Sequence, residues 1–153
     1  MDIIYHYPPE LFNLLVDTIP LLCRSKKDTV LFFKGAGVGS NLTSDVEHHV
    51  LYDKDNINKY EIVRTILSKI NEKGETTLRE RREILKRVTE FESFSNCWPN
   101  DQLKAKGLVS EIRRVINVKD SFTRMRQERE KEKEKSRLEH LNRVNKSPYS
   151  YLS

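Results

Sequence analysis

Residues 58–74 read NKYEIVRTILSKINEKG, and this stretch decides the fold class. Asn58 followed three residues later by Glu61 is typical of a helix N-terminus, where the two side chains cap backbone amides reciprocally. Lys73-Gly74 is typical of a helix stop. Between these ends the apolar side chains recur every three or four residues, at Tyr60, Val63, Ile66, Leu67 and Ile70. That spacing predicts an amphipathic α-helix.

Three more elements are predicted on the N-terminal side of this helix. Residues 8–22 start with two prolines and carry a wide apolar face, and Pro20 is expected to kink or end the helix. A short second element runs through 28–34 and ends at the glycines that follow. Ser44 and Glu47 have the spacing of a capping box, which predicts that a third, short helix opens at Ser44.

On the C-terminal side, two further helices are predicted. Thr77 and Glu80 start the first, and Trp98-Pro99 ends that segment. Asn100 or Asp101 then caps the second, whose apolar residues again recur at helical spacing. No segment alternates apolar and polar residues long enough to indicate a strand. The expected fold is all-α.

Composition divides the chain into two predicted parts. Residues 124–153 carry nine Lys and Arg against five Glu, whereas residues 1–123 carry 19 basic and 18 acidic side chains. Residues 1–123 are therefore predicted to form a compact bundle of five or six helices. Residues 124–153 are predicted to form an extended charged helical linker or tail, frayed at its end.

The glycine-rich stretch at 29–40, TVLFFKGAGVGS, invites a nucleotide-binding interpretation and does not support it. A phosphate-binding P-loop needs Lys-Ser/Thr after the glycines, where this chain has Ser40-Asn41. A dinucleotide fingerprint needs Gly-x-Gly-x-x-Gly, and here the third glycine comes one residue early. The stretch instead predicts a buried helix end, at Leu31-Phe32-Phe33, that unwinds through a glycine turn.

No catalytic constellation, cofactor site or metal site is expected. His48 and His49 are adjacent and would point to different sides of a helix, so they cannot chelate one ion together. Cys23 and Cys97 lie 74 positions apart and are interpreted as buried reduced thiols, which suits a cytoplasmic protein. No stretch has the length of a membrane span. The alternation of glutamate with arginine or lysine at 128–135 is interpreted as charge repetition rather than as part of a nuclease site, and the chain is expected not to be an enzyme.

Basic residues are concentrated in the second half of the body. Residues 78–120 hold ten basic and seven acidic side chains, whereas residues 1–77 hold nine basic and eleven acidic ones. This asymmetry fits either a phosphate-contacting face or a solvated face whose charges pair internally. The candidate nucleic-acid-binding residues are Arg79, Arg82, Lys86, Arg113 and Arg114.

The run FFKGAGVG at 32–39, the stretch 57–125 that begins INKYEIVRTILSKINEKG, and the Glu/Lys/Arg-rich helix after them resemble a known family. They are similar to the N-terminal region of bacterial restriction-endonuclease-like defence proteins. In that family the helical region and charged linker precede an Mrr-type nuclease domain with a PD-(D/E)xK site. The resemblance spans roughly residues 10–135. It implies a nuclease domain beyond Ser153, so no nuclease residue is carried over to this chain.

Two functions are expected from these observations. The first is a non-catalytic helical module of an antiviral defence protein that recognises or positions DNA and is linked to an effector nuclease, either as a C-terminal domain or as a separate chain. The second is a helical protein–protein interaction or oligomerisation adaptor without nucleic-acid binding, whose partner could be another copy of itself. Neither function involves a membrane.

Overall fold

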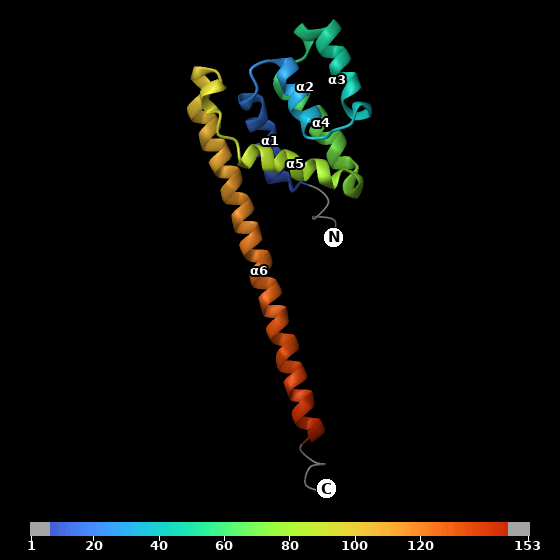
Figure 1. Ribbon diagram of the computed structural model, residues 1–153, viewed down its shortest axis with the longest axis vertical. Helices are drawn as coiled ribbons and strands as arrows, with labels where there is room; N and C mark the ends of the chain where they lie inside the picture. The colour runs from blue at the N-terminus through green and yellow to red at the C-terminus, as the bar shows by residue number, and fades with distance from the viewer. Residues whose placement is uncertain (1–6, 147–153) are drawn as a thin grey trace. The chain divides into compact units, whose positions relative to one another are not determined.

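The fold is all-α, as predicted. The computed structural model describes residues 7–146, with side chains except at 120–124 and 143–146, and contains no strand within that range (Figure 1). The six α-helices are α1 (Pro9–Leu22), α2 (Lys26–Gly35), α3 (Ser40–Tyr52), α4 (Lys59–Glu72), α5 (Leu78–Thr89) and α6 (Gln102–Lys146). Short 3-10 turns lie at Lys54–Asn56, Gly74–Thr77, Phe94–Asn96 and Pro99–Asp101.

The chain divides into two compact units, Met1–Arg114 and Val115–Ser153. The division falls inside α6, nine residues before the boundary at 123/124 that composition suggested. The predicted solvated helix continuing from the body is confirmed by the unbroken helical backbone of α6 to Lys146. In the second unit, every side chain described from 125 to 142 is exposed. The fraying expected at the chain end lies mostly outside the described residues.

Helix α4, which the opening stretch predicted, is central to the packing of the first unit. The predicted capping box is present: Asn58 Oδ1 accepts from the Glu61 amide at 2.8 Å, and Glu61 Oε1 accepts from the Asn58 amide at 3.1 Å. Gly74 follows with a φ of 59°, which ends the helix in the conformation that glycine favours. The helix contacts α1, α2, α3 and α5 (Figure 1). Its fully buried residues are Ile62, Val63, Ile66, Leu67 and Ile70.

Pro20 does not end α1, which continues to Leu22. The last turn of the helix is buried, including Ile19, Leu21 and Leu22. Burying those side chains stabilises the final turn by more than one missing backbone hydrogen bond costs, so the chain stays helical past the proline.

The glycine turn after α2 is confirmed, but the expectation of a wholly buried helix end is wrong at Leu31. Phe33 is fully buried, whereas Leu31 is 51% exposed because it lies on another face of α2. Gly37 has a φ of 98°, and its amide donates to the Lys34 carbonyl at 3.0 Å. The positive φ reverses the chain within a few residues, as at many helix C-termini.

The capping box predicted at Ser44 is wrong, because α3 already begins at Ser40 and Ser44 lies inside the helix. The glycine turn ends at Gly39, whose extended backbone leads directly into the helix. Glu47 has other partners: its carboxylate accepts from the Thr43 hydroxyl at 2.8 Å and from Lys34 Nζ at 2.8 Å. These bonds hold the pKa of Glu47 below its ordinary value.

Helix α5 begins at Leu78, as predicted, but ends at Thr89 rather than near Trp98-Pro99. The Thr77 side chain does not cap it and donates instead to the Ile70 carbonyl at 2.5 Å. Phe91 lies beyond the helix, with its ring edge-on to Phe94 at 5.0 Å. Two 3-10 turns then lead to α6, which starts directly after Asp101, as predicted.

The buried stripe of α4 should dominate stability. Replacing Ile66, which is fully buried, with alanine is expected to lower the free energy of unfolding by about 2–5 kcal/mol, because it leaves a cavity in the core. Leu103→Ala is the control, since Leu103 is 83% exposed and should change stability by less than about 0.5 kcal/mol. Urea denaturation followed by circular dichroism measures both values. Similar losses in the two variants would contradict the core position of α4.

Candidate nucleic-acid interface on α5

Three of the five candidate residues, Arg79, Arg82 and Lys86, lie on one face of α5. All three side chains are exposed. At 3.6 residues per turn, their spacing of three and four residues places them in one row about 10 Å long. The buried residues of the helix, Ile84 and Val88, lie on the opposite side. We call this exposed row the α5 basic face.

The charges of the α5 basic face are not neutralised within the described part of the chain. Helix α5 carries five basic and two acidic residues, a net charge of +3. Glu83 pairs with Arg87 at 2.9 Å, and this hydrogen bond lowers the pKa of Glu83. None of Arg79, Arg82 and Lys86 forms an ion pair with a carboxylate among the described side chains. The row therefore presents three positive charges to solvent.

The other two candidates, Arg113 and Arg114, are engaged within the protein. Arg113 Nε donates to the Thr89 carbonyl at 2.6 Å, where a cation is favourable because α5 ends there. Arg114 forms an ion pair with Glu111, which raises the pKa of Arg114 and lowers that of Glu111. The structure thus separates the five candidates into an uncompensated row on α5 and two internally bonded residues on α6.

Arg81 is the residue of this region that the sequence reasoning missed. It is only 3% exposed, and its guanidinium donates to the Gly74 carbonyl and lies 5.9 Å from the centroid of the Tyr7 ring. The Tyr7 hydroxyl donates to the Arg81 carbonyl at 2.7 Å. Burial lowers the pKa of Arg81 and raises that of Tyr7. Helical spacing could have identified Arg81, because it lies three residues before Ile84 and seven before Val88 on the buried face.

The described histidines, His48 and His49, contact neighbouring side chains of the same segment, and both cysteines are buried. The His48 ring lies 4.7 Å from that of Tyr52, and His49 Nε2 lies 3.3 Å from the Asp53 carboxylate. Cys23 and Cys97 are both buried, as predicted, and are free thiols in the structure, and burial raises the pKa of Cys23 to about 12. Among the described residues, no three His, Cys, Asp or Glu side chains are arranged to hold a metal ion. None of the helices described is long and apolar enough to cross a membrane.

Comparisons of the whole chain with protein-family models, with curated proteins and with solved structures gave no match.

Arg81 should hold α5 in place rather than take part in binding. Arg81→Ala is expected to lower the free energy of unfolding by about 2 kcal/mol or more, because it removes a buried side chain and leaves the Gly74 carbonyl without that donor. Arg82→Ala is the matched control on the same helix and should change stability by less than about 0.5 kcal/mol. Thermal and urea unfolding of both variants test this. Equal stabilities would show that the buried arginine does not anchor the helix.

Proposed function

We propose that the unit Met1–Arg114 is a non-catalytic module that binds duplex DNA through the α5 basic face. The observation that carries this proposal is the row formed by Arg79, Arg82 and Lys86, which points away from the core and has no carboxylate partner among the described side chains. Rows of exposed arginine and lysine provide the phosphate contacts that give most of the affinity in nonspecific DNA binding.

The connection of α5 to the rest of the unit supports the same proposal. Helices α4 and α5 are consecutive and are joined by residues 73–77, which include Gly74 with its positive φ. A helix pair with a short, glycine-containing connection is the arrangement that helix-turn-helix proteins use to bring their second helix to DNA. The buried Arg81 fixes the rotation of α5 about its axis, so the basic face stays outward.

The proposed biological role extends the resemblance noted in the sequence. A module that holds DNA nonspecifically suits the positioning part of a bacterial restriction-type defence protein, with phosphodiester cleavage supplied by an effector nuclease. That effector could follow in the same chain or be a separate cytoplasmic protein. The exposed, charge-rich side chains at 125–142 suit a spacer between the module and such an effector.

A second candidate function is favoured by a different surface. Leu31 and Leu51 are large apolar side chains exposed on α2 and α3. Apolar side chains make no favourable contact with DNA phosphates, so DNA binding does not account for this surface. A helical adaptor that binds another protein or a second copy of itself would use such a surface.

DNA binding should be salt-dependent and should depend on the α5 basic face. We expect the triple variant R79Q/R82Q/K86Q to bind a fluorescein-labelled duplex at least about tenfold more weakly at low salt. The slope of log K against log salt should become less negative by about 2.7 when three phosphate contacts are lost. Fluorescence polarisation titrations at several salt concentrations give both quantities.

The matched control is R64Q/K104Q/K106Q, which removes three exposed basic residues from α4 and the start of α6. It lowers the net charge by the same amount and should keep most of the affinity and of the salt slope. If both triple variants lose affinity equally, net charge alone drives binding and the α5 basic face has no special role. Absence of binding by the unaltered protein at low salt would exclude the proposed function.

A further inference from the structure

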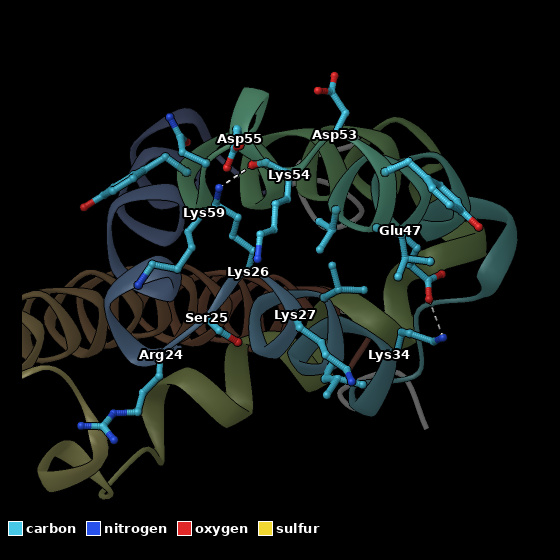
Figure 2. Close-up of a pocket in the computed structure, with 17 residues that line it drawn as sticks. Arg24, Ser25, Lys26, Lys27, Lys34, Glu47, Asp53, Lys54, Asp55 and Lys59 are labelled. Carbon is cyan, nitrogen blue, oxygen red and sulfur yellow. Dashed lines mark hydrogen bonds and ion pairs between the residues drawn. The ribbon is translucent and has the colours of Figure 1, made fainter.

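A groove lies between α2 and α3, away from the row on α5. Its volume is about 1240 Å³, and α2 contributes one of its walls through residues spaced as one helix face (Figure 2). α3 contributes the facing wall in the same way, and the 3-10 turn Lys54–Asn56 with the start of α4 closes one end. The wall residues are Lys27, Val30, Leu31 and Lys34 on α2, and Glu47, Val50 and Leu51 on α3. We call this feature the α2–α3 groove.

The α2–α3 groove gathers exposed apolar side chains. Leu31 is 51% and Leu51 73% exposed, on opposite walls, and the exposed Tyr52 and Tyr60 also line the groove. Val30, which also lines the groove, is buried. Exposed aliphatic side chains on facing walls remain in contact with water until another apolar group lies between them. Removing that apolar surface from water is favourable, so such a surface favours binding of an apolar partner. The groove therefore has an apolar centre that this chain leaves uncovered in its described part.

The charges around that centre are mostly positive. The lining residues include six basic and three acidic side chains, and of the acidic ones Glu47 is paired with Lys34 at 2.8 Å, whereas Asp53 and Asp55 form no ion pair with Lys or Arg in the described part. Five basic lining residues have no carboxylate partner among the described side chains: Arg24, Lys26, Lys27, Lys54 and Lys59. The groove is thus complementary to a partner with an apolar stripe and flanking carboxylates.

Two of these cations are held in place without being neutralised. Lys26 Nζ donates to the Lys54 carbonyl at 2.5 Å, and Lys59 Nζ donates to the Cys23 carbonyl at 2.8 Å. Figure 2 shows both lysines at the opposite end of the groove from the Lys34–Glu47 pair. Backbone carbonyls orient an ammonium group but leave its full charge available. A partner with acidic residues toward that end would gain charge-assisted hydrogen bonds.

We propose that the α2–α3 groove binds an amphipathic helix of a partner protein, with apolar side chains along the face it buries and Glu or Asp beside that face. A helix fits because the two walls are themselves helices, and α2 with ten residues is about 15 Å long, or nearly three turns. An added strand would need a sheet edge, and residues 7–146 contain no strand. The contact side chains would recur at i, i+3 or i+4, and i+7.

Nucleic acid and lipid fit this groove less well. Single-stranded nucleic acid is bound largely by stacking bases on aromatic side chains, whereas the apolar residues on the two facing walls are leucine and valine, and Tyr52 and Tyr60 lie outside those walls. A membrane surface needs a protruding apolar face, whereas the apolar side chains here line a groove. This proposal concerns a surface separate from the α5 basic face and does not depend on DNA binding.

The test uses a displayed library of helical peptides about 18 residues long, long enough to form a helix on binding. Stripe positions vary among apolar residues, and flanking positions vary among Glu, Lys and Gln. Selection on the full chain should enrich Glu over Lys at the flanks, and the enriched peptides should bind in fluorescence anisotropy titrations. The variant L31S/L51S should bind them about tenfold or more weakly, since both leucines lose their contacts.

The variant K27Q/K54Q removes two groove cations whose side chains form no hydrogen bond within the described part, and it should weaken binding several-fold at low salt and less at high salt. Leu103→Ser is the control for an exposed leucine outside the groove, and R79Q/R82Q/K86Q is the control for the α5 basic face; both should bind the peptides normally. Thermal melting checks that every variant is folded, which is expected because all altered side chains are exposed.

Four results would overturn the proposal. They are enrichment of Lys over Glu, equal enrichment on the unaltered protein and on L31S/L51S, equal affinity of the groove variants, and absence of any enriched clone. Vesicles of phosphatidylcholine with phosphatidylserine and a single-stranded thymidine 20-mer serve as competing probes. If L31S/L51S and K27Q/K54Q lose binding to either probe while no peptide binds, the groove takes lipid or nucleic acid and the helix proposal is wrong.

Discussion

The burial of one face of α4 is the constraint on which the rest of the first unit depends. Five aliphatic side chains of this helix are fully buried, and α1, α2, α3 and α5 each contact it. An isolated amphipathic helix would expose its apolar stripe to water. Helix α4 is therefore stable only when these neighbouring helices cover that stripe. Helices α2 and α3 also contact each other directly. The positions of both candidate surfaces therefore follow from this packing.

The buried Arg81 fixes the orientation of α5 relative to the helices packed around α4. A guanidinium is rarely buried, and here its partners are a backbone carbonyl and the face of the Tyr7 ring rather than a carboxylate. The contacts tie α5 to the turn at Gly74 and to the chain just before α1. With Arg81 turned inward, Arg79 and Arg82 on either side of it must turn outward. A buried cation thus sets the direction of the exposed ones.

How much was predictable from sequence depended on how local each determinant was. Helix α4 was predictable to its ends because its caps, Asn58 with Glu61 and then Gly74, are set by neighbouring residues. The capping box predicted at Ser44 is absent because α3 begins at Ser40, directly after the turn at Gly37. Glu47 instead forms an ion pair with Lys34 of α2. Tertiary partners of this kind carry no local signal.

The candidate site divides in the same way. Helical spacing placed Arg79, Arg82 and Lys86 together, since their relation is internal to α5. The hydrogen bond of Arg113 to the Thr89 carbonyl was not predicted, because that carbonyl lies 24 residues away at the end of α5, which comes earlier than the sequence indicated. The α2–α3 groove was not predicted, because it exists only once two helices lie side by side.

The glycine stretch at 29–40, which in our interpretation binds no phosphate, lies near both α5 and the α2–α3 groove. A side-chain carbon at Gly35 would lie 3.0 Å from the Arg87 guanidinium, so a larger residue would shift the end of that flexible side chain slightly. The end of α2 is where helix carbonyls favour a nearby cation. Two residues later, Gly37 reverses the chain so that α3 can form the second wall of the groove. The first glycine therefore leaves room for the Arg87 side chain of α5 beside the end of α2, and the second allows α3 to form the facing wall of the groove. One short turn thus accommodates a side chain from α5 and sets the course of α3.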